Sequence, residues 1–320
     1  MATDAEQLAE RRSLRRRLSG WRIVALLAVL AAIVVGSFWA AGDDIPGTAH
    51  VARVHVSGLI TGDRKTIELL KRVGESAAAK AVLVVVDSPG GTTTGSEAIY
   101  DALRRLSAQK PTVAAIDSIG ASGAYIAAMG TDRIFARHTA LVGSIGVLVQ
   151  FPNFARLLDI VGVKMEEVKS SPLKAAPNGF EPTSPEARAA LASVVSDSYD
   201  WFKGLVRQRR HYDDAQLAAV ADGRVFTGHQ ALALKLIDQM GGERDAVAWL
   251  EANRGVAKDL PVREWRARSG SRFDVLTYAS HIAAVLGFGD LANTLARSEL
   301  AIDASRLDGM LALWHGPSEK

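Results

Sequence analysis

Cysteine is absent from this sequence of 320 residues. Its absence excludes disulfide bonds, cysteine nucleophiles and metal sites built on thiolates. Histidine is sparse, and none of the seven histidines lies in a glycine-rich turn, beside a fitting acid, or at metal-ligand spacing from another. They are His50, His55, His138, His211, His229, His281 and His315. We therefore predict no metal, no cofactor and a catalytic base other than histidine.

An excess of basic charge is also lacking beyond the N-terminal segment. The chain has a net charge of +3 and a pI near 9.1, but its arginines crowd the N-terminal segment. The folded part therefore lacks the basic surface typical of nucleic-acid-binding proteins, and we predict no nucleic-acid partner. Hydrophobic residues make up 48% of the sequence, which is enough for the core of one large domain or two smaller ones.

The N-terminal segment has the pattern of a membrane anchor. Residues 1–22 are basic, residues 23–42 carry no charge, and Trp21 and Trp39 flank the uncharged stretch like interfacial anchors. A helix of this length crosses a bilayer, and basic residues stay on the cytoplasmic side. We predict a cytoplasmic segment 1–22, a single transmembrane helix 23–42 and an exported remainder. A cleaved signal peptide is the alternative, and it would give a mature N-terminus near residue 43.

Strand and helix patterns alternate in residues 48–252, and this order predicts an α/β fold with a parallel sheet and flanking helices. Periodicity predicts the strands and helices, and Ser184-Pro185 marks the start of the longest helix. The expected strands are 51–56, 82–86, 111–116, 133–136 and a short one at 147–149. The expected helices are 64–79, 95–106, one directly after residue 122, 154–161, 184–210, 213–221 and 229–236.

Two glycine-rich stretches stand out within this pattern. Ser122 lies between small residues directly before an apolar helical run, a setting that exposes a nucleophilic hydroxyl at a strand-to-helix turn. The alternative is an ordinary N-cap serine. Upstream, Pro89-Gly90-Gly91 is expected to end the strand 82–86 abruptly in a turn whose amides face a ligand. Because ligands gather at the carboxyl ends of parallel strands, we expect a nucleophile and an oxyanion hole to meet there.

A lysine can serve as the base for such a serine in place of histidine. Burial lowers the pKa of a lysine and allows it to accept a proton. Lys169 and Lys174 lie in a polar loop after the sheet, with few acids nearby. The alternative is that both are solvated loop residues, and spacing alone does not decide between these interpretations.

Four motifs, in order, carry a resemblance to a known family. Ser88–Gly91, Gly120–Tyr125, Leu141–Val147 and Gly223–Ala231, the last followed by Leu236-Ile237-Asp238, resemble those of the signal peptide peptidase A family, the S49 serine-lysine membrane peptidases. The resemblance covers about residues 50 to 250, and the N-terminal anchor agrees with the short form of the family. It implies a ClpP/crotonase-like fold and a serine-lysine dyad.

The family's site residues map onto this sequence one by one. The resemblance implies Ser122 as nucleophile, Lys174 as base and Ser144 as the serine that orients the lysine. It also implies an oxyanion hole formed by Gly90 or Gly91 together with Gly123. Two departures are the acid at position 87, where relatives often have Asn, and a looser segment after Lys174. The second departure keeps Lys169 as a fallback for the base.

The resemblance implies a membrane-anchored serine endopeptidase that degrades cleaved signal peptides and other hydrophobic membrane-derived peptides. It implies a homo-oligomeric ring or dome on the bacterial inner membrane, with an extracytoplasmic catalytic domain and an active site at the subunit interface. The alternatives are a SohB-like peptidase of the same family, a crotonase-type acyl-CoA enzyme and an inactive membrane scaffold. Residues 253–320 resemble nothing known, and their apolar stretch 275–295 is expected to serve assembly or to lie against the membrane.

Overall fold

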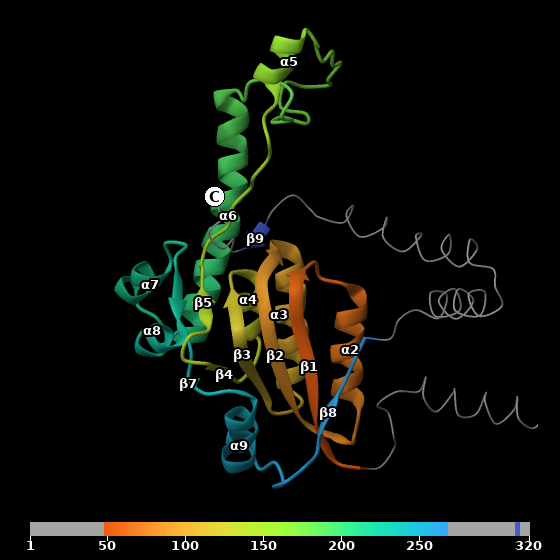
Figure 1. Ribbon diagram of the computed structural model, residues 1–320, viewed down its shortest axis with the longest axis vertical. Helices are drawn as coiled ribbons and strands as arrows, with labels where there is room; N and C mark the ends of the chain where they lie inside the picture. Colours follow the sequence, from red (N-terminus) through yellow and green to blue (C-terminus); the bar gives the residue numbers. More distant parts are fainter. Residues whose placement is uncertain (1–47, 268–310, 314–320) are drawn as a thin grey trace, which may run out of the picture. The chain divides into compact units, whose positions relative to one another are not determined.

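The computed structural model describes residues 48–267 and 311–313. Within these residues the chain forms one mixed sheet with helices on both faces (Figure 1). The strands are β1 His50–Ile60, β2 Ala79–Thr92, β3 Thr112–Ala121, β4 Arg133–Ala136, β5 Leu141–Gly143, β6 Val225–Thr227, β7 Gln239–Met240, β8 Val262–Glu264 and β9 Leu311–Leu313. The helices are α2 Arg64–Glu75, α3 Thr93–Ser107, α4 Gly123–Ala128, α5 Ala155–Val161, α6 Pro185–Arg210, α7 Asp214–Val220, α8 Gly228–Ala233 and α9 Glu243–Asn253.

The sheet is mainly parallel, as the alternation of elements predicted. Its strand order is β6-β5-β3-β2-β1-β8, with β4 pairing with β3 and β7. Only the β5–β6 and β2–β9 pairs among the described strands are antiparallel. The α/β fold with a parallel sheet and flanking helices is therefore confirmed for this part of the chain.

Strand β2 explains why the sequence has a continuous apolar run at its centre. Its alternate side chains Val82, Val84 and Val86 pack into the core beneath α2, α3 and α4. The intervening Leu83 and Val85 pack on the opposite face, against α9. All five are at most 3% exposed. A strand covered on both faces has no polar side, so its sequence shows no alternation.

Several of the expected strand boundaries are wrong. Strands β1 and β3 continue to Ile60 and Ala121, past their expected ends at residues 56 and 116. Strand β2 does not end before Pro89-Gly90-Gly91 but runs through it, with a register shift against β3 between Val86 and Ser88. Glycine makes this continuation possible, because a Cβ on Gly91 would lie 1.9 Å from the carbonyl oxygen of Ile60 on β1. The strand expected at 147–149 is reduced to one isolated bridge, and β5 forms earlier in the chain instead. The turn after Gly143, whose φ is 97°, ends that strand.

Helix α6 has the predicted boundaries and extends away from the sheet (Figure 1). Pro185 occupies the first turn, and the Ser184 side chain accepts a hydrogen bond from the Ala187 amide at 3.1 Å. This arrangement is a helix start with proline in its first turn. The segment from α5 to the start of α6 lies at the end of α6 remote from the sheet.

Parts of the predicted membrane segments and C-terminal extension fall outside the described residues. The expected anchor 23–42 and the apolar stretch 275–295 both lie there. Among the described helices, none combines the length and apolarity that crossing a bilayer requires. Strand β8 lies in the described part of the C-terminal extension and pairs with β1. Next to it, the Trp265 indole donates a hydrogen bond to the buried His50 ring at 3.0 Å.

Candidate active site

Ser122 occupies a sharp turn between β3 and α4. Its backbone has φ 54° and ψ −119°, a conformation that L-residues rarely adopt. Its amide donates a hydrogen bond to the carbonyl of Gly143 on β5 at 2.7 Å. Although the residue stands at the N-cap position of α4, its side chain makes no capping hydrogen bond. The interpretation of Ser122 as an ordinary N-cap serine is therefore wrong.

Ser122 is a buried residue whose hydroxyl has no hydrogen-bond partner among the described residues. The residue is 1% exposed, and every residue of α4 behind it is buried. Its side chain forms no hydrogen bond within the part of the chain that the structure describes. A non-glycine residue in such a backbone conformation costs about 1 to 3 kcal/mol and persists only where its surroundings impose it. The fold thus stores strain at a hydroxyl that is available for chemistry.

The Ser88–Gly91 stretch lies beside Ser122 on the neighbouring strand, since Ser88 pairs with Gly120 across β2 and β3. The Ser88 hydroxyl donates to the carbonyl of Gly58 at 2.6 Å and accepts a hydrogen bond from the Gly90 amide at 3.1 Å. The structure therefore brings the two glycine-rich stretches together, as predicted, although Ser88–Gly91 lies within β2 and not after its end. The Gly90 amide is already engaged by Ser88.

Ser144 is the second serine that the fold places next to Ser122. It follows Gly143, whose carbonyl accepts the Ser122 amide, and it is 7% exposed. Its φ is 52°, and its own amide donates to the carbonyl of Arg224 at 2.8 Å. A Cβ on Gly143 would lie 2.9 Å from the Phe226 ring, so the glycine lets β6 pack closely behind this turn. The motif around Gly143 and the motif around Phe226 therefore support one turn.

Neither candidate lysine is brought to Ser122 within one chain. Lys174 is exposed and lies between α5 and α6, in the segment at the remote end of α6, and its side chain has no partner among the described residues. Lys169 is paired with Glu167 and with Glu181, the second at 2.6 Å. The expectation of few acids near these lysines is wrong for Lys169. These two ion pairs already engage the Lys169 amine, which disfavours Lys169 as the base.

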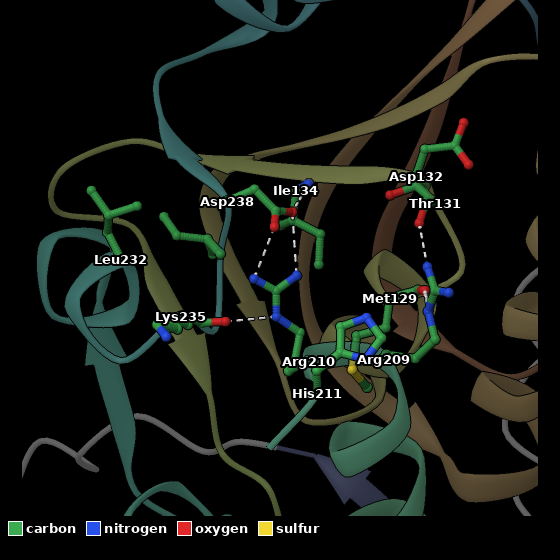
Figure 2. A pocket seen from close by; sticks show the side chains of 11 residues that line it. Met129, Thr131, Asp132, Ile134, Arg209, Arg210, His211, Leu232, Lys235 and Asp238 are labelled. Atoms are coloured by element: carbon green, nitrogen blue, oxygen red, sulfur yellow. Dashed lines mark hydrogen bonds and ion pairs between the residues drawn. The ribbon is translucent and has the colours of Figure 1, made fainter. Parts of the chain in front are cut away.

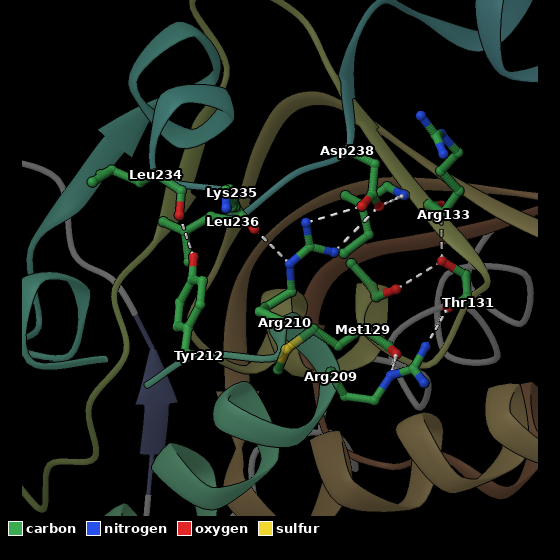
Figure 3. Close-up of polar contacts among 12 residues, drawn as sticks. Met129, Thr131, Arg133, Arg209, Arg210, Tyr212, Leu234, Lys235, Leu236 and Asp238 are labelled. Carbon is green, nitrogen blue, oxygen red and sulfur yellow. Dashed lines mark hydrogen bonds and ion pairs between the residues drawn. The ribbon is translucent and has the colours of Figure 1, made fainter. Parts of the chain in front are cut away.

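The last motif stabilises the fold behind the site. Asp238 accepts a hydrogen bond from the Ile134 amide at 2.8 Å and forms a two-pronged ion pair with Arg210 (Figure 2). The Tyr212 hydroxyl donates to the carbonyl of Leu234 (Figure 3), and burial raises the pKa of Tyr212 to about 12. Tyr125, within the Ser122 motif, donates to the carbonyl of Leu236 at 2.7 Å. These partners lie 22 to 111 residues apart, so no local pattern could reveal them.

The histidines within residues 48–267 take no part in this arrangement. His50 is 1% exposed and bonded to Trp265, and the exposed rings of His138 and His229 lie 4.9 Å apart between centroids. No cluster of three or more side chains suited to hold a metal ion occurs in residues 48–267.

Comparison with known proteins places the chain in a family. The family model for peptidase family S49 matches residues 104–257. A Synechocystis protein described as "Putative protease" is 38% identical over 210 residues, which is 65% of this chain and 76% of that protein. The chain belongs to peptidase family S49. The family match supports a peptidase, and the mixed α/β fold described above agrees with the fold that the motif resemblance implied.

Longer S49 peptidases match over only part of their length. The chloroplastic serine protease SPPA of Arabidopsis thaliana is 30% identical over 235 residues, which is 72% of this chain and 33% of that protein. Protease 4 of Haemophilus influenzae is 27% identical over 225 residues, 67% of this chain and 36% of that protein. The chain thus spans about a third of the length of these two S49 relatives.

Proposed function

We propose that the chain is a serine endopeptidase in which Ser122 and Lys174 form a catalytic dyad. Its main support is the strained backbone of Ser122, which holds an uncapped hydroxyl beside a glycine-rich strand. Structural serines at helix starts use their hydroxyl as a cap, and this one does not. Membership in peptidase family S49 independently supports a peptidase activity.

The oxyanion hole is assigned to the amides of Gly91 and Gly123. Gly123 follows the nucleophile directly, and the amide at this position commonly donates to the oxyanion in acyl-transfer sites. Of the two glycines on β2, Gly90 already donates its amide to the Ser88 hydroxyl, so Gly91 is the better candidate. Removing one such donor typically costs about 3 kcal/mol of transition-state stabilisation.

Lys174 is assigned to the active site of a neighbouring subunit. Within one chain it belongs to the segment between α5 and α6, which lies at the end of α6 remote from the sheet. The same segment exposes many large apolar side chains, a feature of surfaces that bind another protein. They are Phe154, Leu157, Ile160, Val161, Val163, Met165, Val168, Leu173 and Phe180. We infer a homo-oligomeric ring or dome in which this segment contacts the next subunit.

The reaction then follows from the two side chains. Neutral Lys174 takes the proton of the Ser122 hydroxyl as the oxygen attacks the peptide carbonyl. Lys174 returns this proton to the leaving amine, which leaves an acyl-enzyme on Ser122. A water molecule, deprotonated by the same lysine, then attacks the ester. The lysine returns that proton to the Ser122 oxygen as the acyl–oxygen bond breaks, which releases the acid and restores both side chains. Ser144, beside Ser122, would donate or accept a hydrogen bond that orients the amine.

The substrates are proposed to be extended hydrophobic peptides. Strand β9 pairs antiparallel with Gly90–Thr92, so this part of β2 can accept an extended chain. An apolar cavity of about 480 Å³ lies between the segment after Ser144 and α6, with Leu148, Leu191 and Val195 in its wall. Combined with the predicted anchor, these features favour remnant signal peptides and other peptides released from a bacterial inner membrane. The catalytic domain would face away from the cytoplasm.

Hydrolysis of a hydrophobic fluorogenic peptide by the full chain in detergent tests this function. Wild type should cleave it, whereas Ser122→Ala and Lys174→Ala should be inactive while folded and assembled. Lys169→Ala should retain activity. Turnover that persists in Ser122→Ala would refute the mechanism, and an inactive wild type would favour the membrane scaffold instead.

A further inference from the structure

The C-terminal end of α4 is held by arginines from two other helices. After the helix ends, the carbonyls of Met129 and Thr131 accept hydrogen bonds from Nε and Nη2 of Arg209, both at 2.9 Å (Figure 3). The carbonyl of Gly130, between them, accepts a hydrogen bond from Arg104 at 3.3 Å. Helices leave their last carbonyls without partners. Here α6 and α3 supply charged donors to the end of the helix that begins at Ser122.

This arrangement brings two positive charges together in a partly buried place. Burial and, to a lesser degree, the charge of Arg104 lower the pKa of Arg209. Arg209 makes no ion pair among the described residues, whereas the next residue, Arg210, is neutralised by Asp238. Burying a charge without a counter-ion is unfavourable. The two charge-assisted hydrogen bonds from Arg209 to the carbonyls just after α4 must offset this cost.

Helix α4 connects this contact directly to Ser122. The Ser122 carbonyl accepts hydrogen bonds from the amides of Tyr125 and Ile126, and the Tyr125 carbonyl accepts one from Met129. The helix spans only six residues, so two turns separate Ser122 from the carbonyls that Arg209 holds. On the other side, the Ser122 amide is fixed by Gly143. A strained backbone persists only when both of its sides are constrained.

We propose that Arg209 is a positioning residue, which keeps Ser122 in its reactive backbone conformation by fixing the end of α4. This role rests on the proposed function of Ser122 as the nucleophile. Arg209 touches neither substrate nor the reacting atoms and acts through α4 alone. Losing it lets α4 shift, so a smaller fraction of molecules holds Ser122 in the geometry needed for attack.

Steady-state kinetics of the full chain with Arg209→Ala test this role. We expect kcat to fall roughly 10- to 100-fold, as small displacements of a nucleophile do, with KM within about twofold of wild type. The rate at which a fluorophosphonate labels Ser122 should fall by a similar factor. Arg209→Lys, which keeps the charge but can bond fewer carbonyls, should lose less. Arg207→Ala is the matched control, because Arg207 lies on the same helix in an exposed pair with Asp214.

The cavity beside Arg209 allows a second measurement. It has a volume of about 500 Å³ and is lined by Arg209, Met129 and Thr131 (Figure 2). Free guanidinium ion should therefore enter Arg209→Ala and restore part of kcat, whereas urea, which has a similar shape without the charge, should not. Guanidinium should leave Arg207→Ala unchanged.

The outcomes separate the two proposals. If wild type depends on Ser122 but Arg209→Ala and Arg209→Lys both keep its kcat, Arg209 has no positioning role. The same conclusion holds if Arg209→Ala lowers only the melting temperature, with normal kcat and labelling at a temperature where it is folded. If Ser122→Ala itself retains full turnover, the proposed function fails, whatever Arg209 does.

Discussion

Mixed oligomers of two inactive variants should regain activity if the dyad is completed across a subunit interface. Ser122→Ala keeps Lys174, and Lys174→Ala keeps Ser122. A site that takes its serine from one subunit and its lysine from the next is intact when a Lys174→Ala subunit is followed by a Ser122→Ala subunit. In a random equal mixture, half of the subunits carry Ser122, and half of their neighbours carry Lys174. About one quarter of the sites should therefore be active, whatever the number of subunits in a closed ring.

The position of Lys174 in the structure is the reason for expecting activity in the mixed oligomers. The segment that carries Lys174 lies at the end of α6 remote from the sheet, and its apolar side chains are exposed. Co-expression of the two variants with different affinity tags, followed by two-step purification, isolates the mixed oligomers. Hydrolysis of a hydrophobic fluorogenic peptide is then compared with wild type and with each variant alone. Inactive mixed oligomers that are assembled and folded would refute a dyad shared between subunits.

Three further predictions concern the sheet edge and the segment between α5 and α6. Gly91→Ala should lower the free energy of unfolding by about 3 kcal/mol or more and abolish hydrolysis, because its Cβ would lie 1.9 Å from the Ile60 carbonyl. Gly58→Ala is the control, measured by chemical denaturation. Its Cβ would meet nothing within 4 Å, so only the positive φ of 65° should count, and the free energy of unfolding should fall by only about 1 kcal/mol. A chain ending at residue 310 lacks β9, which pairs with the part of β2 proposed to bind an extended substrate. Removing this competitor should lower KM for extended peptides several-fold with kcat unchanged. An unchanged KM would mean that β9 and the substrate bind different parts of the sheet. The hydrogen bond from Lys169, and to a lesser degree one from Asn178, lowers the pKa of Glu181 below its ordinary value of 4.5. The contribution of the Glu181 carboxylate to local stability is therefore complete above the pKa that Glu181 has in the unfolded chain. It is lost as pH falls through the lower pKa that Glu181 has in the folded chain. Hydrogen exchange of residues 162–184 should rise as pH falls below about 4.5 in wild type, after correction for intrinsic rates, and Lys169→Met should lack this dependence.

The sequence predicted the order of the first four strands and of the helices up to α8, because each of these depends on a local pattern. It did not predict the short strands β5 to β9 or helix α9. Buried parallel strands such as β2 are continuous apolar runs, and Ser184-Pro185 marks the start of α6. The strand through Pro89-Gly90-Gly91 escaped prediction because glycine is normally a turn signal. Here the absence of a Cβ on Gly91 instead permits close contact with Ile60. Only the neighbouring strand decides between these two uses of glycine.

The candidate site divides in the same way. Ser122 could be singled out from its small neighbours and the apolar helix that follows, but its strained backbone could not. That strain depends on Gly143 on one side and on Arg209 on the other, which lie 21 and 87 positions further along the chain. The pairing of Lys169 with Glu181 was equally hidden, because the loop between them must fold back before the two side chains meet.

Helix α6 connects the two parts of the proposed active site. Its last turn carries Arg209, which holds the end of α4 behind Ser122, and its first turn follows the segment that carries Lys174. A helix of 26 residues is about 39 Å long at 1.5 Å per residue. In one chain the helix therefore anchors the nucleophile at one end and presents the base at the other. The same rigid element would fix the spacing at which the next subunit must bind, so the assembly and the strain at Ser122 would be set together.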